Sequence, residues 1–387
     1  MHPERIVYIC DWLPPDYGAV GQYSALFARE LAAEGNDVVL VGLSSRADSD
    51  VDETVGDGRL RQVRLRARAY AKTAFWRRLL WTAITNTRIV WRARQVLRDA
   101  DVILFTGSPP YLLHWLAPLN VLLRKRLVYR ITDFHPECLI AQQGRAGPLL
   151  DLVYRLTVFW RRRVHAFEVL GFDQRDLLLA LGIPDGRIRL KRDPSPVEIR
   201  GSERPLARPL DADGRLLLLY SGNWGVAHDY GTFVSAYERH HREGSGRILL
   251  WLNAVGAAVP AIERELARRR LPFVRGEPVP LDELARLLVT PDAHLITLSD
   301  AFVGLVLPSK VHGCIASQRP VLFVGSERSD VHLLCEERMH APYIRVDVGD
   351  VAACSHALER LADLAAGRAA APRQRNQSGT DMEEKRW

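Results

Sequence analysis

Apolar residues in the first half of the chain form short runs that alternate with stretches of helical spacing. Residues 5–10 and 37–43 are β-branched runs, and residues 22–34 between them carry apolar side chains at helical intervals. This strand, helix, strand order predicts a parallel sheet. Further short apolar runs follow at 102–105, 127–131 and 166–171. We therefore expect one layered α/β domain in this half.

A second alternation follows a segment rich in proline and charge, residues 191–211, which has the composition of a linker. Expected strands are 216–220, 248–253, 273–274, 294–297 and 321–323, with helices such as 231–242, 261–270 and 281–288 between them. The prediction is an α/β protein of two Rossmann-like domains, residues 1–195 and 196–365. Residues 366–387 have too little apolar surface to fold and are expected to be a flexible tail.

The composition of the chain is that of a globular protein and limits the compartment in which we expect it. The chain of 387 residues is 47% hydrophobic and 26% charged, as in ordinary globular proteins, and its five cysteines are widely spaced without a CxxC pair. We expect a reducing compartment and no structural zinc. The first residues lack the apolar core of a signal peptide, so we expect a cytoplasmic protein. The uncharged run 102–123 contains Pro109, Pro110 and Pro118, which favours a strand, loop and helix over a membrane span.

The formal charge of +7 is concentrated in one stretch. Residues 59–98 contain twelve Lys or Arg and no Asp or Glu, and apolar side chains from Phe75 to Trp91 recur there at helical offsets. A basic amphipathic surface is typical of contact with anionic lipid, and we assign Trp76, Arg77 and Arg78 to acceptor or membrane contact. The alternative is that the apolar stripe packs on the core and the arginines are solvated. Nucleic acid is not expected as a partner, because no binding motif accompanies the charge.

Three loops at expected strand ends carry candidate chemistry. Gly18 and Gly21 follow the first strand and lead into a helix, where backbone N–H groups can approach a phosphate, although a structural turn would look the same. Gly222, Asn223 and His228 follow the first strand of the second domain. Ligands bind doubly wound sheets at such strand ends, so the pair of loops indicates one ligand held between facing domains.

The third loop begins at Gly304 and delivers Ser309 and Lys310 to the start of a helix. A hydroxyl there can hold a ribose, and an ammonium group can hold a diphosphate. The histidines show no ligand spacing with carboxylates, so we expect no metal site.

Three segments accompany or contain these loops: TDFHPE at 132–137, LYSGNWGVAHD at 219–229 and GLVLPSKVHGCIASQRPV at 304–321. Together they resemble the GT-B glycosyltransferases of family 4, in particular the bacterial branch that builds cell-surface polysaccharides. The resemblance implies two Rossmann-like domains facing across a cleft. It also implies retaining transfer from a nucleotide-diphosphate sugar without a metal or cofactor. By the same resemblance, His135 lies beside the donor sugar and Asp133 orients acceptor hydroxyls.

The sequence departs from the family pattern at two places. Many members carry two glutamates eight positions apart, where this chain has Ala301 and Ser309. The usual Arg and Lys after the first strand of the second domain are also missing, and Asn223 and His228 stand there instead. We therefore expect Lys310 and backbone N–H groups to meet the leaving-group charge.

The function expected from the sequence is transfer of a sugar from a nucleotide-diphosphate donor, with UDP favoured, to a lipid-linked glycan acceptor in surface polysaccharide biosynthesis. The enzyme would be cytoplasmic and peripheral on the inner face of the plasma membrane. Two alternatives remain open. One is a sugar-nucleotide 2-epimerase, which shares the architecture, and the other is a non-catalytic scaffold that binds nucleotide sugars in a polysaccharide assembly complex.

Overall fold

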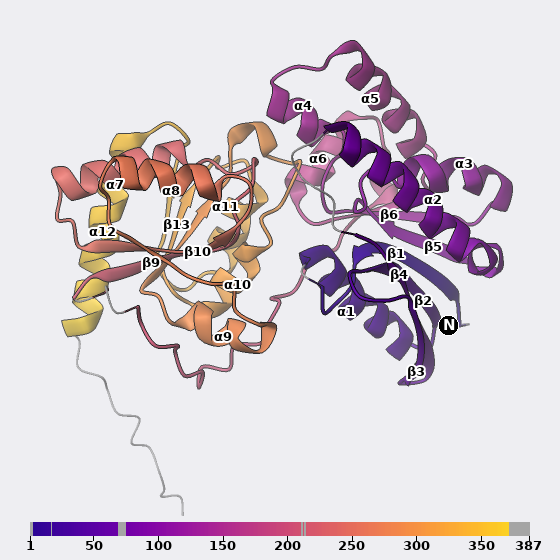
Figure 1. Ribbon diagram of the computed structural model, residues 1–387, viewed down its shortest axis with the longest axis horizontal. Coiled ribbons are helices and arrows are strands. Elements are labelled where there is room, and N and C mark those ends of the chain that lie inside the picture. Colours follow the sequence, from indigo (N-terminus) through magenta and orange to yellow (C-terminus); the bar gives the residue numbers. More distant parts are fainter. Residues whose placement is uncertain (1–2, 17, 69–74, 210–211, 213, 371–387) are drawn as a thin grey trace, which may run out of the picture.

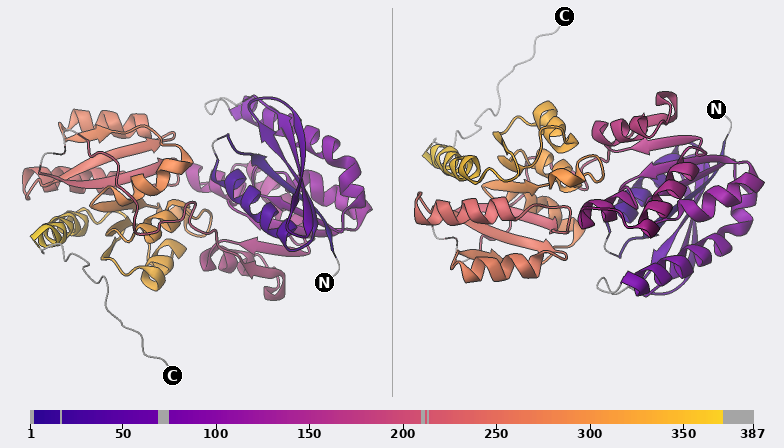
Figure 2. Two further views of the ribbon diagram at one scale, coloured as in Figure 1. Left: turned by 90° about the horizontal axis from the view of Figure 1, so that it is seen from below. Right: turned by 90° about the horizontal axis from the view of Figure 1, so that it is seen from above.

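The computed structural model describes residues 3–16, 18–68, 75–209, 212 and 214–370, without the side chains of residues 75–79 and 365–370. The chain forms two α/β domains that lie side by side along the long axis of the molecule (Figure 1). Each domain contains one mostly parallel sheet with helices on both faces (Figure 2). This confirms the expected pair of Rossmann-like domains.

The first sheet has eight strands in the order β3-β4-β2-β1-β5-β6-β7-β8. Its strands are β1 (Arg5–Trp12), β2 (Asp37–Ser44), β3 (Ser49–Val55), β4 (Gly58–Arg66), β5 (Val102–Thr106), β6 (Arg126–Ile131), β7 (Ala166–Val169) and β8 (Ile188–Leu190). The helices of this domain are α1 (Ala19–Ala33), α2 (Phe75–Asp99), α3 (Leu113–Leu123), α4 (Glu137–Gln143), α5 (Pro148–Arg161) and α6 (Phe172–Ala180).

The hairpin of β3 and β4 changes the interpretation of the basic run 59–98. Its first residues form strand β4, which pairs with β3 in antiparallel register. Arg59 and Arg61 each form an ion pair with an aspartate of β3, at N–O distances of 2.8 and 2.7 Å. Acidic residues that precede the run therefore neutralise part of its charge. Helix α2 is the basic amphipathic helix expected from the sequence.

The second sheet has six strands in the order β11-β10-β9-β12-β13-β14, all parallel. Its strands are β9 (Leu216–Asn223), β10 (Ile248–Val255), β11 (Phe273–Arg275), β12 (Ala293–Thr297), β13 (Val321–Val324) and β14 (Tyr343–Val346). The helices are α7 (Gly231–Arg242), α8 (Val259–Arg268), α9 (Leu281–Val289), α10 (Lys310–Ser317), α11 (Asp330–Arg338) and α12 (Val351–Ala370), with a 3₁₀ turn at Asp300–Phe302.

The end of the chain differs from the sequence prediction. Residues 366–370, expected to begin a flexible tail, continue α12 to Ala370. Alanine-rich sequence has high helix propensity, and α12 packs along α7. The remainder of the predicted tail, residues 371–387, lies outside the described residues.

The uncharged run 102–123 forms β5, a loop and α3, with Pro118 inside the helix. This agrees with the strand, loop and helix expected from its prolines. Across the described residues, we find no helix that combines the length and the apolar character needed to cross a bilayer.

The two domains share one apolar core cluster, which sets their relative position. Phe134 and Val169 of the first domain belong to the same buried cluster as Phe302, Val311 and Leu334 of the second. Burial of apolar surface is the main favourable term in such an interface. The edges of the sheets that face this cluster are therefore held next to each other.

Polar contacts between α6 and α11 reinforce the junction. The Asp330 backbone N–H donates to the Asp173 carboxylate at 3.0 Å, and the Phe172 N–H donates to the Asp330 carboxylate at 2.9 Å. Each aspartate thus accepts from an amide in the first turn of the other helix, which helices leave without an internal partner. Arg192 donates to Asp330 at 3.1 Å and adds a positive charge to the pair.

Gly21 permits the close packing of α1 on β1. A Cβ at this position would lie 1.7 Å from the Trp12 carbonyl oxygen, which belongs to backbone and cannot move aside easily. We expect Gly21→Ala to lower the free energy of unfolding by about 2 to 3 kcal/mol, as measured by urea denaturation. Gly18→Ala is the matched control, because its Cβ would meet nothing closer than 3.9 Å. Equal stability of the two variants would contradict the packing role.

Candidate active site

Most of the residues singled out in the sequence follow the carboxyl ends of the parallel strands. β9 ends at Asn223, and β6 is followed by the turn of residues 132–136 that precedes α4. Open parallel sheets bind ligands at this edge.

Lys310 is the first residue of α10, and its ammonium group is buried in aromatic surroundings. The Nζ atom lies 3.3 Å from the centroid of the Tyr220 ring. It has no hydrogen-bond partner within the described part of the chain. Burial holds the pKa of Lys310 well below its usual range. A buried cation at the amino end of a helix is a place where an anion would be strongly favoured.

Tyr220 fixes the floor of this site and was not assigned a role from the sequence. Its ring stacks on the Trp224 ring at a centroid distance of 3.5 Å, and both residues are fully buried. The Tyr220 hydroxyl donates to the Asn223 carbonyl at 3.3 Å, which ties the strand end to the following loop. The Tyr and Trp of the motif 220–229 could have indicated a cation site from the sequence, because buried aromatic rings at a strand end are suited to hold a cation.

His228 lies close to Lys310 and is neutral. Burial, together with the positive charge of Lys310, lowers the pKa of His228 to about 3. Its Nδ1 contacts the Thr297 carbonyl at 2.5 Å, and since a carbonyl only accepts, the ring donates through Nδ1. The Nε2 atom is then an acceptor. This geometry suits a hydroxyl group of a ligand better than a phosphate oxygen.

The predicted glycines have different surroundings. Gly222 has φ +100° and open space around its Cβ position, so its backbone conformation alone favours glycine. Gly304 has φ +75° and donates its N–H to the Asp173 carboxylate of the first domain at 3.2 Å. Gly304 therefore has a contact between domains, and a role in donor binding stays a prediction. Asn223 is exposed beside Gly222, and Ser309 directly precedes α10.

The turn of residues 132–136 brings the first domain to this site. Asp133 forms an antiparallel bridge with Val306, and the Phe134 N–H donates to the Leu305 carbonyl at 2.9 Å. Residues 304–306 lead directly to Ser309 and Lys310. The structure therefore brings the turn that contains His135 against the segment that carries the buried ammonium group, although the two are 175 positions apart in the chain.

An arginine of α5 holds this turn, a role that was not predicted from the sequence. Arg161 is fully buried and forms a bidentate ion pair with Glu137, the first residue of α4. The same guanidinium donates to the His135 carbonyl at 3.0 Å and lies 4.9 Å from the Phe134 ring centroid. A planar guanidinium can bond two acceptors at fixed angles, so Arg161 restricts the position of the His135 backbone.

Two carboxyl groups lie beside the turn. Burial and the charge of Asp11 raise the pKa of Asp133 to about 6. Burial also raises the pKa of Asp11 to about 6, although the Ser108 hydroxyl donates to its carboxylate at 2.7 Å. Neither Asp11 nor Ser108 was chosen from the sequence, although Asp11 begins the first glycine loop. Carboxyl groups with pKa values near neutrality are suited to bind and release protons or to accept from sugar hydroxyls.

Two groups of predicted residues have other places in the fold. Gly18 and Gly21 lie at the start of α1, where Gly21 has the packing role described above. Trp76, Arg77 and Arg78 fall in the first turns of α2, and their side chains lie outside the described residues. Across the described chain, no group of three or more His, Cys, Asp or Glu is placed to hold a metal ion.

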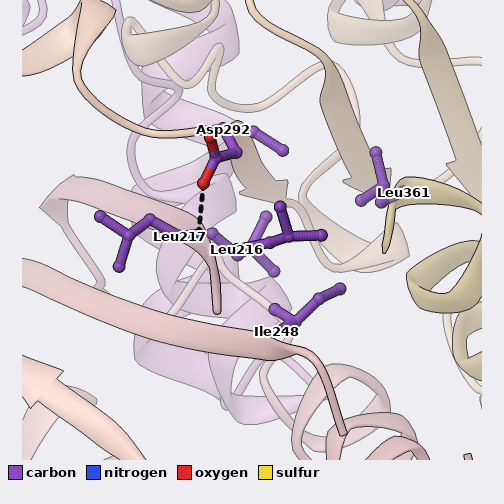
Figure 3. A pocket seen from close by; sticks show the side chains of 7 residues that line it. Leu216, Leu217, Ile248, Asp292 and Leu361 are labelled. Carbon is purple, nitrogen blue, oxygen red and sulfur yellow. Dashed lines mark hydrogen bonds between the residues drawn. The ribbon is translucent and has the colours of Figure 1, made fainter. Parts of the chain in front are cut away.

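A small hollow in the second domain lies at the opposite edge of the sheet. It is lined mainly by leucine and isoleucine side chains at the amino ends of β9 and β10, and Asp292 accepts from the Leu217 N–H at 2.8 Å (Figure 3). It has room for about one water molecule. Because of its size and position, this hollow is not a candidate for sugar or nucleotide binding.

The raised pKa of Asp133 predicts a pH-dependent effect on stability. The fold disfavours the ionised form, so the carboxylate destabilises the protein above pH 6 and this cost disappears as the pH falls toward 4. We expect Asp133→Asn to raise the free energy of unfolding at pH 7.5 by about 1 to 2 kcal/mol and to have little effect at pH 4. Urea denaturation at the two pH values measures this. Asp57→Asn, at an exposed turn, is the control, and equal effects of both substitutions would contradict the prediction.

No protein-family model matches this sequence, and no curated protein matches it significantly. Solved structures do match its fold. An α,α-trehalose-phosphate synthase (UDP-forming) from Burkholderia vietnamiensis has a TM-score of 0.62 at 14% identity, with 92% of this chain and 91% of that chain covered.

Two further structures match over similar lengths. Anabaena Alr3699/HepE, in complex with UDP and glucose, has a TM-score of 0.60 at 10% identity, covering 95% of this chain and 93% of that one. WaaG, described as a glycosyltransferase involved in lipopolysaccharide biosynthesis, has a TM-score of 0.56 at 15% identity, covering 92% and 90%. These proteins are GT-B glycosyltransferases, and the chain described here has the same GT-B fold of two Rossmann-like domains.

Proposed function

We propose that this protein is a retaining glycosyltransferase of family 4 type, which moves a sugar from a UDP-sugar to a lipid-linked glycan in surface polysaccharide biosynthesis. The observation that carries the proposal is the buried ammonium group of Lys310, which has no hydrogen-bond partner among the described residues and lies at the amino end of α10. Such a charge is costly in the free protein and is stabilised when a diphosphate occupies the site.

The donor would bind along the carboxyl end of β9. Lys310 and the first amides of α10 would contact the diphosphate, and Ser309 would contact the ribose. Gly222 and Asn223 leave the backbone accessible beside them. The Nε2 atom of His228 would accept from a sugar or ribose hydroxyl. Because these groups supply positive charge without a metal, the proposal includes a metal-independent reaction with no cofactor.

UDP is the proposed nucleotide because two structures of the same fold are described with it. HepE was solved with UDP and glucose, and the trehalose-phosphate synthase is described as UDP-forming. His135, on the turn that contacts residues 305–306, would stabilise the positive charge that develops on the sugar as UDP leaves. Asp133 would accept from the acceptor hydroxyl.

The lipid-linked acceptor is proposed from the outer surface of the first domain. α2 buries Ile89 but leaves Leu80, Ile84 and Trp91 exposed, next to the exposed Arg88. We also propose membrane contact for Trp76, Arg77 and Arg78, which belong to the same helix. A basic helix with apolar side chains is suited to the surface of an anionic bilayer. The site of action would then be the inner face of the plasma membrane.

Nucleotide binding is the most direct test of the proposed function. The protein is heated with UDP, GDP or ADP, and its melting temperature is measured, because a ligand of the native state stabilises it by mass action. UDP should raise the melting temperature most. If no nucleotide raises it, the proposal fails. If UDP-sugar alone is isomerised, the protein is an epimerase, and binding without turnover over a broad acceptor panel indicates a scaffold.

Lys310→Met removes the proposed diphosphate contact while keeping the length of the side chain. A charge-assisted contact contributes about 1.5 to 3 kcal/mol, so UDP should bind roughly ten- to a hundredfold more weakly by calorimetry. The depressed pKa of Lys310 adds a second expectation. The charged amine destabilises the fold below pH 10, so the variant should melt at a higher temperature than the wild type at pH 7. Weaker binding with lower stability would indicate a damaged fold instead.

His135→Ala should separate catalysis from donor binding. The side chain would act on the sugar and not on the nucleotide, so the affinity for UDP should stay within about twofold while transfer or donor hydrolysis falls on the order of a hundredfold. Radiolabelled donor turnover and calorimetry measure the two quantities. His332→Ala, on α11, is the control. Unchanged turnover in the His135 variant would remove the proposed role.

A further inference from the structure

Helix α5 presents an apolar stripe to solvent. Leu149, Leu152, Leu156 and Phe159 are 59, 62, 44 and 43% exposed. Their spacing of three, four and three residues places them on one side of the helix. The neighbouring helix α3, which contacts α5, has an exposed leucine of its own, Leu122, at 80% exposure. Contiguous exposed apolar side chains of this kind mark an interaction surface.

The opposite side of α5 holds the catalytic turn. Thr157 and Arg161 are buried, and Thr157 contacts the His114 ring at 2.9 Å. Arg161 bonds the Glu137 carboxylate and the His135 carbonyl, as described above. One helix of fourteen residues therefore joins the exposed stripe to the turn that contains His135.

Charge around the stripe identifies the class of partner. Residues 145–163 contain five arginines and a single acidic residue, Asp151. Arg161 is buried, and the other four are exposed. Asp151 pairs with Arg155, so Arg145, Arg162 and Arg163 leave an excess of positive charge beside the leucines. The Arg163 guanidinium lies 3.5 Å from the Phe159 ring centroid, which places a cation directly over the apolar stripe.

We propose that the outer face of α5 docks on an anionic lipid bilayer and that docking restrains the turn of residues 132–137 through Arg161. The acyl chains of the membrane would bury the leucines, and its negative headgroups would bind the arginines. A second copy of the chain fits less well, because a two-fold contact through this stripe would bring the two basic borders together. The inference rests on the proposed function for its purpose, since a lipid-linked acceptor would meet the site at the membrane. The surface itself is independent of α2.

Vesicle flotation tests the docking surface. The full-length protein is mixed at low salt with vesicles of phosphatidylcholine alone or with added phosphatidylglycerol. The wild type should float only with the anionic vesicles, and Leu152→Glu/Leu156→Glu should bind roughly tenfold more weakly. The control is Leu281→Glu/Leu333→Glu, which changes two exposed leucines of the second domain and should bind like the wild type.

Three outcomes overturn the docking proposal. A wild-type protein that stays unbound at low salt has no such surface. A Leu152/Leu156 variant that binds like the wild type assigns membrane contact to another helix. If light scattering shows a dimeric wild type and a monomeric variant, the occupant of the stripe is a second copy. Circular dichroism and the melting temperature establish that the variants are folded.

Hydrogen exchange tests the link to the turn. Amides of residues 132–143 in the wild type should exchange severalfold more slowly on anionic vesicles than in solution, and those of the Leu152/Leu156 variant should not change. Membrane binding without slower exchange overturns the link through Arg161. Neither measurement needs a nucleotide. Absence of UDP binding would therefore refute the proposed transfer reaction and leave the docking surface standing. A Leu152/Leu156 variant that floats like the wild type would refute the docking surface and leave the transfer reaction standing.

Discussion

The site depends on backbone contact between two loops from different domains. The Phe134 N–H donates to the Leu305 carbonyl, and Asp133 bridges to Val306, so the turn that carries His135 is held against the segment that carries Lys310. Because these bonds involve main-chain atoms, they fix the loops whatever the side chains are. The shared apolar cluster and the contact of Gly304 with Asp173 keep the same edges together. The junction therefore brings groups from both domains to one place in the fold.

The same site contains several charged groups in unfavourable surroundings. Lys310, Asp133 and Asp11 all have pKa values shifted toward their neutral forms by burial. A fold selected only for stability would replace such groups with apolar residues. Arg161 and Glu137, by contrast, neutralise each other and bond the backbone around them. Burial disfavours the charge of the first three groups, whereas Arg161 and Glu137 compensate each other, and this difference follows from their partners rather than from their residue types.

Much of the fold could be predicted from the sequence because the apolar runs of buried parallel strands are distinctive. The hairpin of β3 and β4 was not predicted, because both strands are rich in charged residues and β3, which lies at the edge of the sheet, has no fully buried side chain. Within the site, glycines and Lys310 were recognisable from their places at strand and helix ends. Arg161 lies in a row of three arginines, and nothing in that row indicates which one faces inward. Its role depends on the rotation of α5 about its axis, which packing determines.

The reciprocal contacts of Asp173 and Asp330 have a consequence for how the two domains vary in evolution. Each carboxylate completes the first turn of a helix that belongs to the other domain, and a Cβ on Gly171 would collide with both side chains. Changing one aspartate alone removes the side-chain acceptor of an amide in the first turn of the other domain's helix. Homologues that rearrange this junction should therefore change positions 171, 173 and 330 together. These positions at the boundary between the domains should covary more strongly with one another than with the rest of either domain.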